Sequence, residues 1–250
     1  MRQRRRLGRL LAALDDSQWA APSRCVGWAV RDVVGHIDIV NQFWSFSIAS
    51  GLSGSPTRVL EGFDPAATPA AMAKDLEDVP ASELLARYEA STEALASTIC
   101  GLDADQLAML AEAPPGHIAV RDVVLHALWD GWVHERDIVL PLRGAPTIEP
   151  DEVRGALLYA AALGAAFAAT SGSGRIGAMA IVPTDLVDPF VVEIAEAVVV
   201  RPGTAPRGAA ELSGTAVELL ESLSCRADEP SLSTSVRWMT DGLREVFDLA

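Results

Sequence analysis

Two histidines and an aspartate are spaced four residues apart in the stretch HALWDGWVHERD, residues 126–137. His126, Asp130 and His134 fall on one face of a helix, because residues four apart are neighbours on a helix surface. Imidazole and carboxylate groups are common ligands of zinc, and two ligands of one ion are commonly four apart on a helix. The stretch therefore indicates a metal-binding helix, and its alternative is a polar stripe on a solvated helix.

The rise of the helix limits how many of these groups can reach one ion. At about 1.5 Å per residue, groups four apart lie about 6 Å apart, whereas His126 and His134 lie about 12 Å apart. One ion takes either His126 with Asp130 or Asp130 with His134, and the spacing alone leaves both pairings open. The missing ligand has to come from another helix. His36 is the best candidate, since His117 belongs to a Pro- and Gly-containing loop.

An internal repeat relates His36 to the same helix. AVRDVVGH at 29–36 recurs as AVRDVVLH at 119–126, identical in seven of eight positions. Each copy follows a turn, begins a long helix and ends on a histidine. Packing of the valines and the preference of Asp for a helix N-terminus explain most of the motif but not the histidine. The repeat predicts a helical bundle with approximate two-fold internal symmetry.

The spacing of apolar residues predicts the elements that position these groups. Four helices, which together form a bundle, are expected in the first half at 2–15, 29–50, 82–100 and 118–140, with a long connection at 51–80. The Pro-rich segment 141–152 predicts a boundary between domains 1–145 and 146–250. The second half contains an Ala-rich helix, β-like runs and two further helices, at 151–170, 176–183, 190–200, 211–223 and 237–249. The expected fold class is α+β, a four-helix bundle followed by a small α+β domain.

Composition excludes several classes of partner. The formal net charge of −14 disfavours nucleic acid and anionic membranes, which bind clustered cationic surfaces. The basic stretch MRQRRRLGR could belong to a twin-arginine signal, but leucines at helical spacing favour an amphipathic first helix. No apolar run reaches the roughly 18 residues of a membrane helix. Three cysteines without a CxxC pair indicate a reduced, cytoplasmic protein, each cysteine being a small buried hydrophobe.

Two motifs resemble a known family. APSRCVGWAVRDVVGHI, residues 21–37, is similar to the signature of the mycothiol-dependent maleylpyruvate isomerase family, a branch of the DinB-like metal-binding bundles. DGWVHERDI, residues 130–138, resembles the family's acid-x-x-x-His-x-x-Asp segment, although the isomerase itself usually has Glu at the position of Asp130. ELSGTAVELLESLSCRA, residues 211–227, resembles its appended α+β domain. The resemblance thus covers nearly the whole chain.

The resemblance implies a particular ligand set and chemistry. The ligands would be His36, Asp130 and His134, holding a divalent ion, most consistently Zn²⁺. His126 would be a neighbour of the site that contacts substrate. Family members bring the thiol mycothiol to the metal, and its thiolate attacks a small electrophilic substrate, giving isomerisation or S-conjugation.

Three protein ligands leave a coordination position open, as in catalytic metal sites. Two alternatives to thiol chemistry therefore remain: another metal-dependent reaction on the same fold, such as hydrolysis or a natural-product step, and a non-catalytic metal- or ligand-binding protein.

Other side chains near the motifs could support such a site. Asp137, and less favourably Asp38, could orient an imidazole through its second nitrogen. The cationic residues Arg31 and Arg136 could hold an anionic substrate or the thiol's polar groups, and Trp132 could contact the thiol cofactor. Their plainer interpretation is solvated arginines and a core tryptophan.

Overall fold

The structure, a computed structural model, describes residues 1–61, 64, 68, 75–76, 78–170, 174–204, 210–227 and 237–246. The chain divides into two units, Met1–Thr147 and Ile148–Ala250, and the division falls within the Pro-rich segment 141–152. The α+β fold class is confirmed. Of the predicted connection 51–80, residues 62–63, 65–67, 69–74 and 77 lie outside the described residues, as do 247–249 of the predicted final helix.

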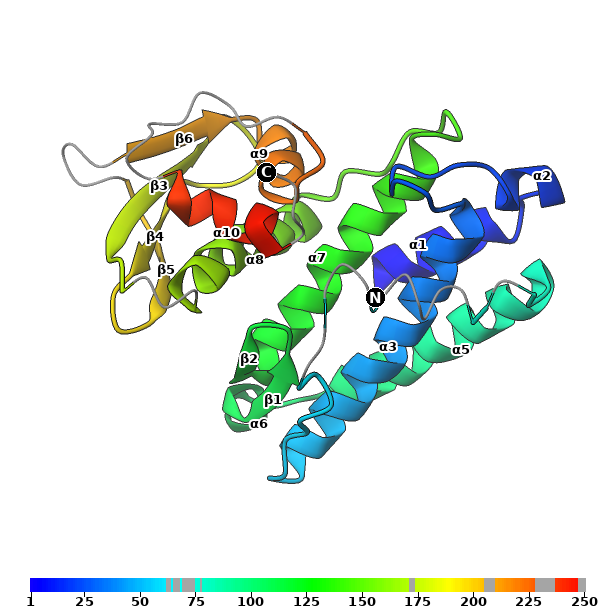
Figure 1. Cartoon of the computed structure of the whole chain (residues 1–250), viewed down its shortest axis with the longest axis horizontal. Coiled ribbons are helices and arrows are strands. Elements are labelled where there is room, and N and C mark those ends of the chain that lie inside the picture. The colour runs from blue at the N-terminus through cyan, green and yellow to red at the C-terminus, as the bar shows by residue number, and fades with distance from the viewer. Residues whose placement is uncertain are drawn as a thin grey trace. The chain divides into compact units, whose positions relative to one another are not determined.

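Long helices dominate the first unit (Figure 1). Its elements are α1 (Arg2–Leu11), α2 (Asp16–Trp19), α3 (Val30–Leu52), α5 (Ala81–Ile99), α6 (Ala104–Ala108), β1 (Leu110–Ala113), β2 (Gly116–Ala119) and α7 (Val120–Val139). The long helix α3 packs against both α5 and α7, and α1 packs against the same two helices. These four helices form the bundle that the apolar periodicity predicts.

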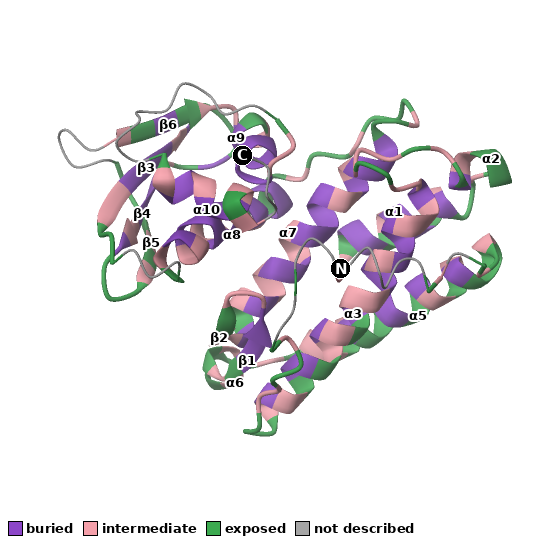
Figure 2. Cartoon of the chain, in the orientation of Figure 1, coloured by how far each residue is buried: buried purple, intermediate pink, exposed green. Residues whose placement is uncertain are grey.

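Buried residues recur along the four helices (Figure 2), and the apolar ones among them form the core of the bundle. At one end Leu7 of α1, Ile37 of α3 and Leu84 of α5 belong to a single buried cluster. At the other end Trp44 of α3 and Val123 of α7 belong to a second cluster. Burial of these side chains fixes the rotation of each helix, and so determines which polar residues point inward.

The first copy of the repeat is capped by its own aspartate. Ala29 is the N-cap of α3 and has no side chain that could accept a hydrogen bond, but its backbone N–H donates to Asp32 Oδ2 at 2.8 Å. Half of a capping box is therefore retained. Ala119 occupies the corresponding position before α7.

A β-hairpin that the sequence analysis did not predict precedes α7. Strands β1 and β2 pair antiparallel around the Pro–Pro–Gly turn, and Glu112 on β1 is buried. Its carboxylate accepts hydrogen bonds from the hydroxyl of Thr57 and the backbone N–H groups of Val59 and Leu60. His117 on β2 is exposed, and its Nε2 lies 2.7 Å from the carbonyl oxygen of Thr57. The hairpin thereby holds the segment that follows α3.

In its described residues, the second unit combines a sheet with helices. Its elements are α8 (Pro150–Thr170), β3 (Gly177–Pro183), β4 (Phe190–Ile194), β5 (Val198–Pro202), β6 (Ala210–Gly214), α9 (Ala216–Leu223) and α10 (Trp238–Val246). The strand order is β5-β4-β3-β6, with β6 parallel to β3 and the other pairs antiparallel. The single strand predicted at 190–200 is wrong, because Ala195–Ala197 form a turn between β4 and β5. Glu193 and Glu196 are three residues apart and cannot share one face of a single strand, so the break in the period of two marks this turn.

Helix α8 is long and apolar enough, by length and composition, to cross a membrane. However, 56% of its most apolar window is buried within the fold, and α8 packs against α9 and α10. Small residues allow a close crossing: a side chain at Gly242 of α10 would meet the backbone of Ala168 at 2.7 Å. These contacts are those of a packed core helix.

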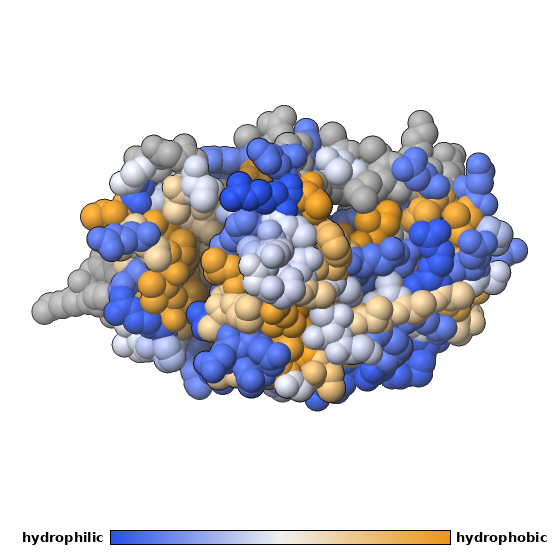
Figure 3. Space-filling view, turned by 90° about the horizontal axis from the view of Figure 1, so that it is seen from below, coloured by the Kyte–Doolittle hydropathy of each residue, from blue (hydrophilic) through white to orange (hydrophobic). Residues whose placement is uncertain are grey.

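Hydrophobic and hydrophilic residues are interspersed on the face seen in Figure 3. Large exposed apolar side chains occur at separate places in the described chain, among them Val26, Phe46 and Ile176. Isolated apolar residues of this kind are ordinary on protein surfaces.

Candidate metal centre

Helices α3 and α7 bring three ligand-type side chains together. His36 comes from α3, and Asp130 and His134 come from α7. His36 Nε2 lies 3.6 Å from Asp130 Oδ1, and His134 Nε2 lies 3.4 Å from the same oxygen. One potential ligand atom from each residue lies within 4.8 Å of the other two. The cluster is therefore compact enough for a single metal ion.

The helix spacing leaves open whether Asp130 pairs with His126 or with His134, and the positions of the side chains in the bundle distinguish the two pairings. Asp130 and His134 belong to the compact group with His36, whereas His126 lies one turn before Asp130 and outside the group. The ring of His126 is buried, with its centroid 4.5 Å from that of Trp44 and 5.3 Å from that of Trp129. His126 is thus a neighbour of the cluster.

The carboxylate of Asp130 has unused bonding capacity. Its Oδ2 is buried and has no hydrogen-bond partner among the described residues, and Oδ1 faces two imidazole nitrogens. A buried carboxylate is normally paired, and Oδ2 has a cation beside it in place of a hydrogen bond, because Arg4 Nη2 lies 3.6 Å away. Two imidazoles and one carboxylate are a ligand set that zinc accepts in catalytic sites. The donor set around Oδ1 fits a divalent ion.

The same groups shift each other's pKa values. Burial alone would raise the pKa of Asp130, but the adjacent His134 and His36 hold it well below its usual value. Burial alone would lower the pKa of His134, but Asp130, with further contributions from Asp137 and Cys25, raises it well above its usual value. Without a metal the cluster is therefore an ion pair in which a proton on His134 occupies the place of a cation.

Arg4 lies on the other side of Asp130. Its guanidinium is buried, with Nη2 3.6 Å from Asp130 Oδ2. The other nitrogens are held firmly: Nε donates to Asn41 Oδ1 and Nη1 to the carbonyl of Ala127, each at 2.7 Å. This cation fixes the position of the carboxylate from behind. No sequence motif marks Arg4 as a site residue, although it falls on the stripe of α1 that carries Leu7 and Leu11.

Gly131 leaves room for the guanidinium group of Arg4. A Cβ at position 131 would overlap Arg4 Nη1 and lie 2.8 Å from Gln3 Oε1. A glycine inside a helix costs about 1 kcal/mol relative to alanine. The packing of Arg4 explains why α7 nevertheless has a glycine beside its acidic residue.

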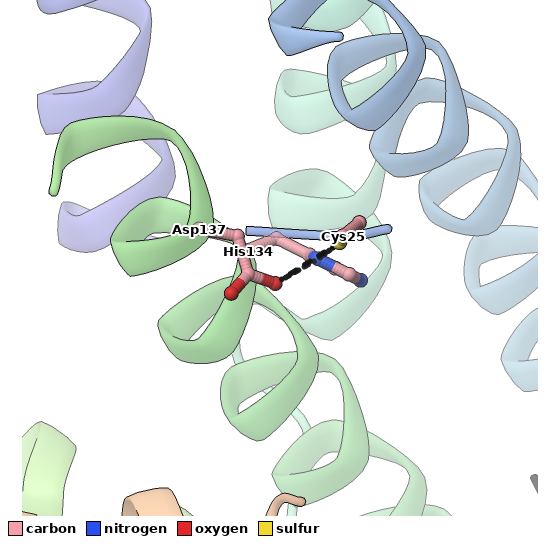
Figure 4. Close-up of side chains that lie close together, drawn as sticks. All are labelled: Cys25, His134 and Asp137. Carbon is pink, nitrogen blue, oxygen red and sulfur yellow. Dashed lines mark hydrogen bonds and ion pairs between the residues drawn. The ribbon is translucent and has the colours of Figure 1, made fainter. Parts of the chain in front are cut away.

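The second ring nitrogen of His134 contacts a buried acid. His134 Nδ1 donates to Asp137 Oδ2 at 3.1 Å, and Cys25 from the turn before α3 donates its thiol proton to the same oxygen at 3.2 Å (Figure 4). A carboxylate on Nδ1 fixes the ring and leaves Nε2 to face an ion. Asp38, the other candidate for this role, instead accepts from Gln42 and Arg87.

The cysteines differ from expectation. Cys100 is exposed, and Cys25 and Cys225 are partly buried, so the prediction that each is a small buried hydrophobe is wrong.

The other predicted site residues have structural contacts. The guanidinium of Arg31 donates to the backbone carbonyls of Leu76 and Val79, so it anchors the connection before α5. Trp132 is buried, and the guanidinium carbon of Arg136 lies 4.7 Å above its ring centroid. None of the three belongs to the compact ligand group.

Two histidines and one carboxylate thus converge in a helical bundle that precedes a small α+β unit. The family model for the mycothiol maleylpyruvate isomerase N-terminal domain matches residues 1–139. The chain therefore belongs to this family.

Solved structures agree on the fold. A crystal structure of the mycothiol-dependent maleylpyruvate isomerase has a TM-score of 0.63 and 14% sequence identity, covering 93% of this chain and 89% of the other. A structure of a mutant of that isomerase has a TM-score of 0.62 and 13% identity, with the same coverage. No curated protein matches the sequence significantly.

Proposed function

We propose that the chain is a divalent-metal-dependent enzyme that uses a thiol, mycothiol, to isomerise or S-conjugate a small electrophilic substrate. The observation that carries the proposal is the convergence of His36 and His134 on the buried carboxylate of Asp130. Family membership supports mycothiol as the thiol, and the name of the solved relatives makes maleylpyruvate the first substrate to test. Free cysteines in the described chain accord with a reducing, cytoplasmic setting.

His36 Nε2, Asp130 Oδ1 and His134 Nε2 would hold the ion, for which Zn²⁺ is the most consistent choice. When bound, such an ion supplies a positive charge that keeps a coordinating thiol deprotonated, and three protein ligands leave a position open for it.

The protein's own side chains prepare this centre. Asp137 fixes the ring of His134 through Nδ1, and Arg4 supports Asp130 from behind. The edge of His36 contacts Trp28, with ring centroids 5.5 Å apart, which limits rotation of this ligand. Burial of Asp130 and partial burial of both histidines limits the access of water.

His126 would act beside the centre as a neutral group. Burial, with smaller effects of nearby charges, lowers its pKa to about 4, so it is uncharged near neutral pH. A neutral imidazole next to Trp44 and Trp129 suits a substrate contact and disfavours a role as a cationic anchor. Arg136 and Trp132 remain proposed contacts of an anionic group or of the thiol. Arg31 would act only through the loop that it holds.

The first experiment is metal analysis of the purified protein. His36→Ala and Asp130→Asn should each lose one equivalent of bound divalent metal relative to the wild type. His117→Ala is the matched control, because His117 is exposed on the hairpin and contacts Thr57 instead of the cluster. If the wild type binds no metal after reconstitution, the proposal is wrong.

The second experiment measures turnover of maleylpyruvate with and without mycothiol. We expect thiol-dependent isomerisation that is lost in His36→Ala and kept in His117→Ala. Metal binding with thiol-independent turnover would support the alternative of another metal-dependent reaction on this fold. Metal binding without turnover of electrophiles, with or without thiol, would support a non-catalytic metal-binding protein.

A further inference from the structure

A second group of potential ligands lies against the first. Cys25 Sγ, His134 Nδ1 and Asp137 Oδ2 lie within 4.8 Å of one another (Figure 4). His134 and Asp137 come from α7, and Cys25 comes from the turn between Pro22 and Ala29. The group shares one imidazole with the first centre but uses its other nitrogen.

The distances match those of a coordination shell. Sγ is 3.2 Å from Asp137 Oδ2 and 3.9 Å from His134 Nδ1, and Nδ1 is 3.1 Å from Oδ2. A tetrahedral zinc ion, with bonds of about 2.3 Å to sulfur and about 2.0–2.2 Å to nitrogen or oxygen, separates its ligand atoms by about 3.3–3.6 Å. Shifts of a few tenths of an ångström would therefore complete three corners of a tetrahedron.

The turn holds Cys25 in place. The backbone N–H of Trp28 donates to the carbonyl of Cys25 at 3.0 Å, and the N–H of Cys25 donates to Ser23 Oγ at 3.1 Å. The N–H of Arg24 donates to the carbonyl of Asp137 at 3.0 Å and ties the turn directly to α7. The thiol is thus fixed beside Asp137, and an ion would not have to order this segment.

We propose that Cys25, His134 and Asp137 form a second metal site, which takes thiophilic divalent ions such as Cd²⁺ or Zn²⁺. A thiolate ligand selects soft ions, whereas the first centre contains only nitrogen and oxygen ligands. Binding releases the thiol proton to solvent, together with the proton that His134 Nδ1 donates to Asp137. An ion here replaces the hydrogen bond that orients His134 and so weakens the first centre. The inference concerns metal binding and does not depend on thiol-dependent turnover.

Cd²⁺ is the probe, because thiolate–cadmium bonds produce an ultraviolet charge-transfer absorption. The starting protein is the full chain with Cys100→Ser and Cys225→Ser, stripped of metal, so that Cys25 is the remaining thiol. Titration with Cd²⁺ should produce the thiolate absorption band. Cys25→Ser should abolish the band and still bind one Cd²⁺ at the first centre.

His36→Ala distinguishes the two sites. It removes a ligand of the first centre and leaves Cys25, His134 and Asp137 intact, so the band should persist with one bound Cd²⁺. Loss of the band in His36→Ala would mean that Cys25 joins an ion held by the first centre, and would overturn the second site. Absence of the band in the starting protein would show that the thiol only donates a hydrogen bond to Asp137.

X-ray absorption at the cadmium edge gives a readout that needs no substitution at Cys25. In the His36→Ala protein with Cys100→Ser and Cys225→Ser, one sulfur should appear in the cadmium shell beside nitrogen and oxygen. A shell of nitrogen and oxygen alone would contradict the proposal. Because His36→Ala removes the proposed catalytic centre, the outcome is separable from the success or failure of the proposed enzyme activity.

Discussion

Arg4 and Asp130 form a buried ion pair that joins the first helix of the bundle to the ligand-bearing helix α7. Arg4 Nη2 lies 3.6 Å from Asp130 Oδ2, and neither atom has a hydrogen-bond partner among the described residues. The arginine is therefore positioned by its other nitrogens and acts on the carboxylate mainly through its charge. Asp130 is held between this fixed cation and the place where an ion would bind.

Replacing Arg4 with Gln should destabilise the metal-free protein by about 1–3 kcal/mol, because it removes one of the two cations beside the buried Asp130 and disrupts the buried hydrogen bonds to Asn41 and Ala127. Arg5→Gln is the control: the side chains of the Arg5–Glu93 pair are about half exposed, so loss of this pair should change the free energy of unfolding little. Denaturant unfolding measures both. Equal losses of unfolding free energy in the two variants would show that the buried Arg4–Asp130 pair stabilises the fold no more than the exposed pair does.

Gly131→Ala should destabilise the protein by about 1–3 kcal/mol, because the new methyl group overlaps the Arg4 guanidinium. Gly8→Ala in α1 is the matched control. Its methyl group would make an ordinary contact of 3.5 Å with Tyr88, so it should stabilise by about 0.5–1 kcal/mol. In an Arg4→Gln background the cost of Gly131→Ala should fall. An unchanged cost there would contradict the assigned clash.

Asp137→Asn should weaken Zn²⁺ binding at the first centre by about 10–100-fold, because the carboxylate that orients His134 is lost. Asp38→Asn is the control: Asp38 is equally buried but bonds to Gln42 and Arg87. Competition with a chelating dye measures both affinities. A similar loss in the Asp38 variant would indicate a general effect of burying an amide.

The affinity for metal should depend on pH through His134. Its raised pKa means that the ion has to displace a proton, so the apparent Kd should rise by about tenfold for each pH unit below that pKa. Calorimetry in buffers of different ionisation enthalpy counts the released proton. A Kd that does not change across the acidic range would exclude a His134 ligand.

The free energy of unfolding of the metal-free protein should fall as the pH rises through the raised pKa of His134. The raised pKa of His134 contributes stability that is fully present below the unfolded value of about 6.5 and is lost as the pH rises through the folded value. The depressed pKa of Asp130 contributes stability that is present above about 3.9 and is lost as the pH falls. The ion pair therefore stabilises the fold most between these limits.

The sequence predicts the bundle well because apolar residues at helical spacing define both the helices and their buried faces. Tertiary contacts account for most of what it misses. The Glu112 hairpin is stabilised by the distant residues Thr57, Val59 and Leu60, so no local pattern reveals it. The turn at 195–197 consists of Ala, Glu and Ala and contains none of the Gly, Pro, Asn or Asp residues typical of turns, so its composition does not reveal it.

The candidate site, too, is predicted in part by local spacing and depends in part on tertiary contacts. Spacing on one helix identifies Asp130 and its neighbouring histidines, but it cannot choose between His126 and His134. That choice depends on which turn of α7 lies opposite His36 of α3, and only the packing of the two helices determines this. The contact of Cys25 with Asp137 joins a turn to a helix more than a hundred residues away, and no local sequence pattern predicts it.

The packing of Arg4 against Gly131 has a consequence for how such chains diverge. A side chain at position 131 would overlap the guanidinium of Arg4, so position 131 can enlarge at little cost only after position 4 has become smaller. Related sequences should therefore vary at the two positions in step: a glycine after the acidic residue wherever the arginine is present, and a larger residue only where the arginine has been replaced. Positions 4 and 131 are far apart in the sequence, but substitutions at the two positions should be correlated among related proteins.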